Sequence, residues 1–129
     1  MASAALTQVQ QALVDQVNKV IGFTNGFLAN DVADALALAH STGDAGGEAA
    51  WTEIQKTLSN ILPTSIPAGA GIAYFIQVAR NFAINQGPFN AAVGQVFPQL
   101  VTAYNLAVSQ LYTLTASGAV VPVPVPPVA

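Results

Sequence analysis

Apolar residues recur every three or four positions along the N-terminal third of the chain, and this period predicts an amphipathic helix. The apolar stripe of this first helix comprises Leu6, Val9, Leu13, Val17, Val20 and Ile21. Gly22 and Gly26 follow the stripe, so we expect the helix to end there. Asn30 is a favourable N-cap for a second helix over residues 31–40, with two aspartates in its first turn.

Two further apolar segments follow, separated by glycine and proline. The loop STGDAGG leads into a helix over residues 48–62. The stripe of that helix contains Trp51, Ile54, Leu58 and Ile61. The segment IAYFIQVARNFAIN, at residues 72–85, is apolar on almost every side, which predicts a helix at the centre of a bundle.

The last helical segment, residues 88–118, contains a proline in its interior. Pro98 predicts either one kinked helix or a short helix followed by a longer one. We expect its packing side to contain Val101, Tyr104, Leu106, Val108, Leu111 and Leu114. The alternation of apolar and polar residues that marks strands is not sustained anywhere. The sequence therefore predicts an all-α bundle of five or six helices, forming one domain over residues 1–118.

Valine and proline alternate at the C-terminus, in the stretch VVPVPVPPVA. Each proline lacks a backbone N–H and clashes with the preceding turn, so this stretch cannot continue a helix. It cannot form an inner strand of a sheet either. We therefore expect residues 119–129 to be a disordered tail that acts as an extended, polyproline-like linker.

Charged residues make up only 7% of the chain, whereas a soluble domain usually has about 25%. The polar surface must come from ten glutamines, eight asparagines, six serines and nine threonines. Such a surface is wetted by water but repels its own copies weakly, which favours self-association with like modules.

Charge and hydropathy also exclude several classes of partner. The net charge is −3, and only Lys19, Lys56 and Arg80 are cationic, so a nucleic-acid partner is not expected because phosphate binding needs clustered cations. The chain contains no run of 18 apolar residues, so no membrane span is expected. It contains no cysteine, which removes disulfides and thiolate metal sites.

The few chemically reactive residues do not form a recognisable catalytic or metal-binding motif. His40, the only histidine, has Ser41 and Asp44 beside it, but all three lie at a glycine-rich loop that cannot hold a triad rigidly. Asp31 and Asp34 form one carboxylate pair, and Glu48 and Glu53 lie on the next helix. These are too few for a calcium site, and helix-start electrostatics accounts for Asp31, Asp34 and Glu48. We expect no enzyme activity, no cofactor and no metal.

Arg80 is the only arginine, and it lies among apolar residues in the middle of a predicted helix. A guanidinium there needs a partner. One interpretation is a salt bridge to one of the carboxylates of Asp15, Asp31, Asp34 or Glu53. A second interpretation is that Arg80 anchors the carboxylate of a fatty acid whose tail lies between helices. A third is that Arg80 is exposed and unpaired.

Almost uncharged helices rich in Ala, Gln, Asn, Ser and Thr, followed by the stretch VPVPVPP, resemble a helical repeat module of a spider-silk protein. The proline stretch is similar to the Pro-X-Pro linkers of the pyriform silks. The resemblance implies an extracellular, secreted, non-enzymatic domain that keeps a silk protein soluble and contributes to its assembly.

Three hypotheses for function follow from these features. The first is a structural, self-assembling module with a proline-rich linker. The second is a helical-bundle carrier of a hydrophobic small molecule such as a fatty acid, because bundles bind ligands between facing helices. The third is a secreted adhesin on a proline-rich stalk, which only the tail supports.

Overall fold

The structure is a computed structural model that describes residues 8–117, with side chains as far as residue 114. Within that range the chain contains helices and no strand. The helices are α1 (Gln8–Gly26), the π-helical segment η1 (Phe27–Val32), α2 (Ala33–Thr42), α3 (Ala45–Ile61), α4 (Ile72–Ile84), α5 (Gln86–Val93) and α6 (Pro98–Ser117). Because α1, η1 and α2 are continuous, the described residues form five helical rods, which confirms the predicted all-α class. The predicted tail, residues 119–129, lies outside the described residues.

The continuity of the first rod corrects the predicted break at Gly22 and Gly26. Both glycines are exposed, on the side of the rod that faces solvent. A glycine inside a helix costs about 1 kcal/mol relative to alanine. The helix continues because Phe27 (4% exposed) and Val32 (0%) are buried in the core beyond them, and burial of each such side chain contributes about 1.5–3 kcal/mol. Asn30 is therefore not an N-cap, and its side-chain amide donates to the carbonyl of Gly26, the last residue of α1.

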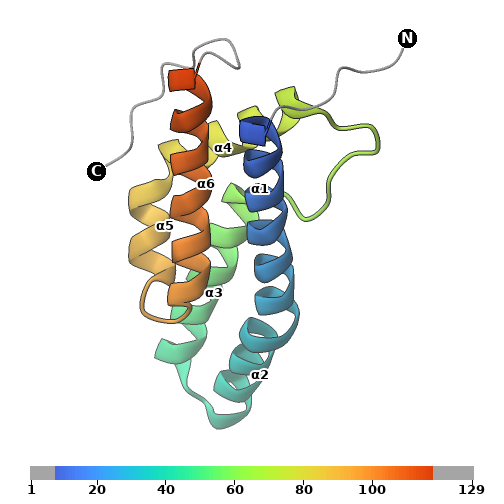
Figure 1. Ribbon diagram of the computed structural model, residues 1–129. Helices are drawn as coiled ribbons and strands as arrows, with labels where there is room; N and C mark the ends of the chain where they lie inside the picture. Colours follow the sequence, from blue (N-terminus) through green and yellow to red (C-terminus); the bar gives the residue numbers. More distant parts are fainter. Residues whose placement is uncertain (1–7, 118–129) are drawn as a thin grey trace.

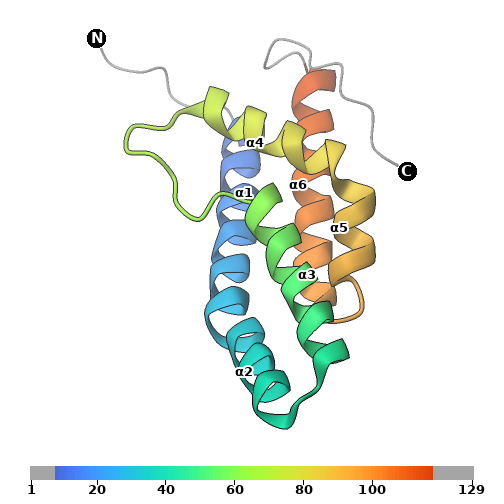
Figure 2. The ribbon, with the colours of Figure 1, turned by 180° about the vertical axis from the view of Figure 1, so that it is seen from behind.

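The helices pack as an elongated bundle with one helix across its end (Figure 1). α6 runs beside α1, and α5 lies on the other side of α6. α2 returns through a tight turn into α3, and this hairpin extends beyond the ends of α5 and α6. The view from behind shows α4 lying across the opposite end, where it contacts α1, α5 and α6 (Figure 2).

The centre of the core is a stack of three aromatic rings from three helices. Tyr104 of α6 lies between Phe82 of α4 and Phe89 of α5, at ring-centroid distances of 4.5 and 3.8 Å. All three side chains are fully buried. The Tyr104 hydroxyl donates to the backbone carbonyl of Phe82 at 2.6 Å. Burial raises the pKa of Tyr104 far above its usual range, because the core disfavours the phenolate.

The predicted central position of the helix at 72–85 is wrong. α4 buries Phe75, Ile76, Ala79, Phe82 and Ala83 on one side, while Ile84 remains 55% exposed. α6 runs along the bundle beside α1 and α5, whereas α4 lies across the end of the bundle (Figure 2). A helix that lies across the end of a bundle needs only one buried side, and small or apolar residues on its other side do not place it at the centre.

Pro98 marks the boundary between the short helix α5 and the longer helix α6. This confirms the second of the two predicted alternatives, a short helix followed by a longer one. Pro98 is the first residue of α6, where the missing N–H removes no helical hydrogen bond. The predicted packing side of α6 is confirmed for Tyr104, Val108, Leu111 and Leu114, which are buried. Leu106 is the exception, since 44% of it is exposed.

Candidate functional site

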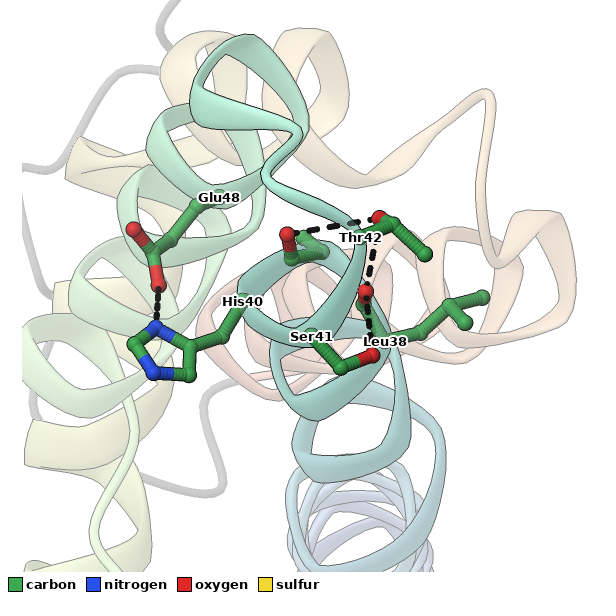
Figure 3. A network of polar contacts seen from close by, with 6 residues as sticks. Leu38, His40, Ser41, Thr42 and Glu48 are labelled. Atoms are coloured by element: carbon green, nitrogen blue, oxygen red, sulfur yellow. Dashed lines mark hydrogen bonds and ion pairs between the residues drawn. The ribbon is translucent and has the colours of Figure 1, made fainter.

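His40 and its neighbours lie at the turn between α2 and α3 and do not form a triad (Figure 3). His40 Nδ1 lies 3.3 Å from a carboxylate oxygen of Glu48, across the mouth of the hairpin. The Ser41 hydroxyl points away from the imidazole and donates to the carbonyl of Leu38. His40 is 83% exposed, so the pair is screened by water and contributes little.

Asp44 begins α3 as its N-cap. The Asp44 carboxylate accepts a hydrogen bond from the backbone N–H of Gly47 at 2.9 Å. The predicted helix begins at Glu48, three residues too late. An aspartate before a helical stripe is a recognised N-cap signal, so this feature was visible in the sequence. Asp44 is therefore engaged in capping rather than in orienting His40.

The other carboxylates are dispersed over the surface. Asp31 and Asp34 are exposed on the first rod, and Glu53 is exposed on α3. Glu48 lies in the first turn of α3 as predicted. Among residues 8–117, no group of three or more His, Cys, Asp or Glu side chains could hold a metal ion.

Arg80 does not form the predicted salt bridge. It is half-buried on α4, and its Nη1 donates to Oε1 of Gln77 one turn earlier, at 3.4 Å. No carboxylate within the described part of the chain lies within ion-pairing distance of it. Arg80 also does not line either of the grooves described next. Its role as the anchor for a fatty-acid carboxylate stays a prediction.

The larger groove, of about 470 Å³, lies between the end of α3 and the middle of α4. We call it the α3–α4 groove. Its walls carry no charged side chain. The lining residues are Ser59, Asn60, Ile61, Leu62, Pro63, Tyr74, Gln77, Val78 and Asn81. The two helices are joined across it by Asn81, whose amide donates to the carbonyl of Ile61 at 2.9 Å.

A smaller groove of about 250 Å³ lies between α1 and α6. Gln16 crosses it, because its amide donates to the carbonyl of Ala103 at 3.0 Å. The ammonium group of Lys19 lies 5.8 Å from the centroid of the Phe23 ring at its α1 side. Leu106 forms part of the opposite wall.

All but one of the charged residues lie in the N-terminal half of the chain. Eight of the nine lie between positions 15 and 56, and Arg80 is the only one in residues 57–129. The helices α4, α5 and α6 therefore present an almost uncharged surface. Sequence reasoning used the low total charge and missed this uneven distribution, although the sequence itself contains it.

The outer side of α6 is the clearest part of this uncharged surface. Its exposed residues follow one helical stripe, which we call the neutral face: Gln99, Thr102, Leu106, Ser109 and Thr113. The hydroxyl groups of Thr102 and Thr113 donate to carbonyls four residues earlier in the helix. The hydroxyl hydrogens of both threonines are thus already bonded within the helix, which lowers the free-energy cost of removing water from this stripe. Leu106 lies at its middle, and Lys19 borders it across the smaller groove.

Within residues 8–117, no helix is both long enough and apolar enough to cross a membrane. Comparison of the chain with known protein families, with curated proteins and with solved structures finds no match.

Proposed function

We propose that this chain is a non-enzymatic structural module that associates with like modules through the neutral face of α6. The observation that carries the proposal is the exposure of Leu106 in the middle of a stripe without charge. This stripe belongs to residues 57–129, where Arg80 is the only charged residue. The neutral face itself contains no charged group, and Lys19 is the charged residue that borders it. An interface centre depleted of charge is typical of protein–protein contacts.

The setting we propose is an extracellular, silk-like protein in which this helical domain is joined to its neighbours by the Pro-Val segment. The support is compositional: the amide-rich and hydroxyl-rich helices and the stretch VPVPVPP. A buried aromatic core beneath a surface with few charges suits such a module, since the domain stays folded while its surface favours association. Weak contacts repeated along a chain of linked modules reinforce one another through effective concentration.

The association should have a modest free energy for a single pair of modules. Full burial of a leucine contributes about 1.5–3 kcal/mol, and Leu106 is already partly covered, with 44% exposed. Burial of the remainder contributes about 1 kcal/mol per copy. Because the neutral face contains no charge, the association should change little between low and high salt.

The test is sedimentation equilibrium of the full chain over a wide concentration range. Leu106→Lys should weaken association by about tenfold or more, because it places a charge in the proposed contact. Leu38→Lys is the matched control, since Leu38 is 65% exposed on α2, outside the neutral face. Both variants change the net charge equally. Equal weakening by the two variants, or a wild-type chain that stays monomeric at millimolar concentration, would refute the proposal.

A further inference from the structure

The α3–α4 groove has an apolar floor and a rim with unused hydrogen-bond donors. Ile61 and Leu62 are buried at its base. The side chains of Asn60 and Tyr74 make no hydrogen bond to any described residue. Gln77 accepts from Arg80 through its oxygen, which leaves its amide N–H groups without a partner among residues 8–117. The groove therefore offers three donors around an apolar base.

These features match a polyproline-type segment better than a helix or a small anion. A polyproline II chain forms no internal hydrogen bonds, so its carbonyls are free to accept, and its prolines have no N–H to donate. Proteins bind such segments in grooves that combine aromatic or proline side chains with donors aimed at the carbonyls. Tyr74 and Pro63 supply the flat apolar surfaces here, and Tyr74 also offers its hydroxyl.

The chain itself contains such a segment, which follows α6 directly in the sequence. α6 ends at Ser117, at the same end of the molecule as α4, which it contacts (Figures 1 and 2). Residues 118–129 follow, and twelve residues in polyproline II conformation span about 37 Å. A short tether also gives a segment a high effective concentration at a site on its own domain.

We infer that the α3–α4 groove binds the Pro-Val segment at residues 120–128 of the same chain. The segment keeps the extended conformation expected from its sequence, but it lies against the bundle instead of free in solvent. Neither the segment nor the groove lining contains a charged residue, so docking should be insensitive to salt. Docking within one chain requires no association between copies and is therefore independent of the proposed association through the neutral face of α6.

The experiment compares backbone amide NMR spectra of full-length variants. Replacement of Pro122, Pro124 and Pro126 by glycine removes the polyproline preference without shortening the chain. We expect amide shifts to change around the groove, at Leu62 and Gln77, and to stay unchanged in the α2–α3 turn. An unchanged groove, or changes confined to another surface, would overturn the inference.

The reciprocal variant alters the groove. Asn60→Ala together with Gln77→Ala removes two donors from exposed positions, and the amide shifts of Val123 and Val125 should move toward those of an unstructured chain. Gln55→Ala is the matched control, because Gln55 is an exposed amide elsewhere on α3, and it should leave the tail unaffected. The effects should persist on about hundredfold dilution. Loss of the effects on dilution would overturn the inference by showing that the groove binds the segment of another copy.

Discussion

Tyr104→Phe tests how far the stability of the bundle depends on one buried hydroxyl. The substitution keeps the ring, and with it the stacks on Phe82 and Phe89. It removes only the hydrogen bond to the carbonyl of Phe82. That carbonyl belongs to the last turn of α4, where carbonyls have no partner within the helix. In the variant it would be buried without one.

The magnitude follows from this geometry. A buried polar group left unsatisfied costs about 1–3 kcal/mol, and the hydrogen bond here is short, at 2.6 Å, in a fully buried site. We expect the free energy of unfolding to fall by about 2 kcal/mol. For a domain of this size, that corresponds to a melting temperature lower by about 6–12 °C.

The assay is urea denaturation followed by far-ultraviolet circular dichroism, with the slope of the transition expected to stay unchanged. Tyr74→Phe is the matched control, because Tyr74 is only half-buried and its hydroxyl makes no hydrogen bond to any described residue. Both variants are made in the chain with Pro122, Pro124 and Pro126 replaced by glycine, so that the proposed docking of the Pro-Val segment does not contribute. The control should change the free energy of unfolding by less than about 0.5 kcal/mol. If Tyr104→Phe is equally mild, the buried hydrogen bond does not stabilise the bundle and the reasoning fails.

Three further predictions concern pH and the start of α3. Folding raises the pKa of Tyr104. The stability that Tyr104 contributes is therefore fully present below about pH 10. Above about pH 10 the unfolded state loses a proton that the folded state keeps, so this stability is lost as the pH rises. When the free energy of unfolding is measured as a function of pH, Tyr104 should lower it by about 1.4 kcal/mol per pH unit above that point, and this fall should be absent in Tyr104→Phe. Asp44→Ala removes the N-cap of α3 and should cost about 1 kcal/mol in urea denaturation; no loss would rule out the cap. Gly46→Ala should stabilise α3 by about 0.5–1 kcal/mol, whereas Gly47→Ala should gain less or nothing, because its Cβ would collide with the Asp44 carboxylate. Equal gains at both positions in the same assay would contradict this.

The helical class and most core positions can be predicted from the sequence, because the apolar stripes repeat with the helical period. Leu106 shows where this fails. From the sequence we predict that Leu106 packs with the other apolar residues of α6, yet at 100° per residue it lies far around the helix from Tyr104, Val108 and Leu111. The helical period alone is enough to distinguish Leu106 from the packing residues of α6. The position of α4 could not be predicted in the same way, because it depends on which helices meet at the end of the bundle.

The candidate sites were predictable to a smaller extent. The low charge predicts association, but the surface that we propose for it depends on which side of α6 is left uncovered by α1, α4 and α5. Arg80 is a lone cation among apolar residues in the sequence, which predicts a distant carboxylate partner. Its actual partner is Gln77, one turn away on the same helix, and a local amide leaves no pattern in the sequence that distinguishes it from a distant carboxylate. The α3–α4 groove joins residues from two helices and the intervening loop, and no local motif marks it.

The continuity of the first rod is the point at which structure and sequence pattern differ most, and it can be tested directly. Nothing lies within 4 Å of a Cβ placed at Gly22 or Gly26, and neither has a positive φ. If both lie inside a helix, Gly22→Ala and Gly26→Ala should each raise the free energy of unfolding by about 0.5–1 kcal/mol.

The contrasting variant is Gly43→Ala. Gly43 ends α2 with a φ of 70°, in the left-handed region where alanine is strained, so this substitution should lower the free energy of unfolding by about 1 kcal/mol. Open space surrounds all three glycines, so the sign of each effect reports backbone conformation and not packing. A helix that ended at Gly22 or Gly26, as the sequence pattern predicts, would most readily use a left-handed glycine there. Alanine would then destabilise that position as it does at Gly43, and the continuous rod from α1 to α2 would be refuted.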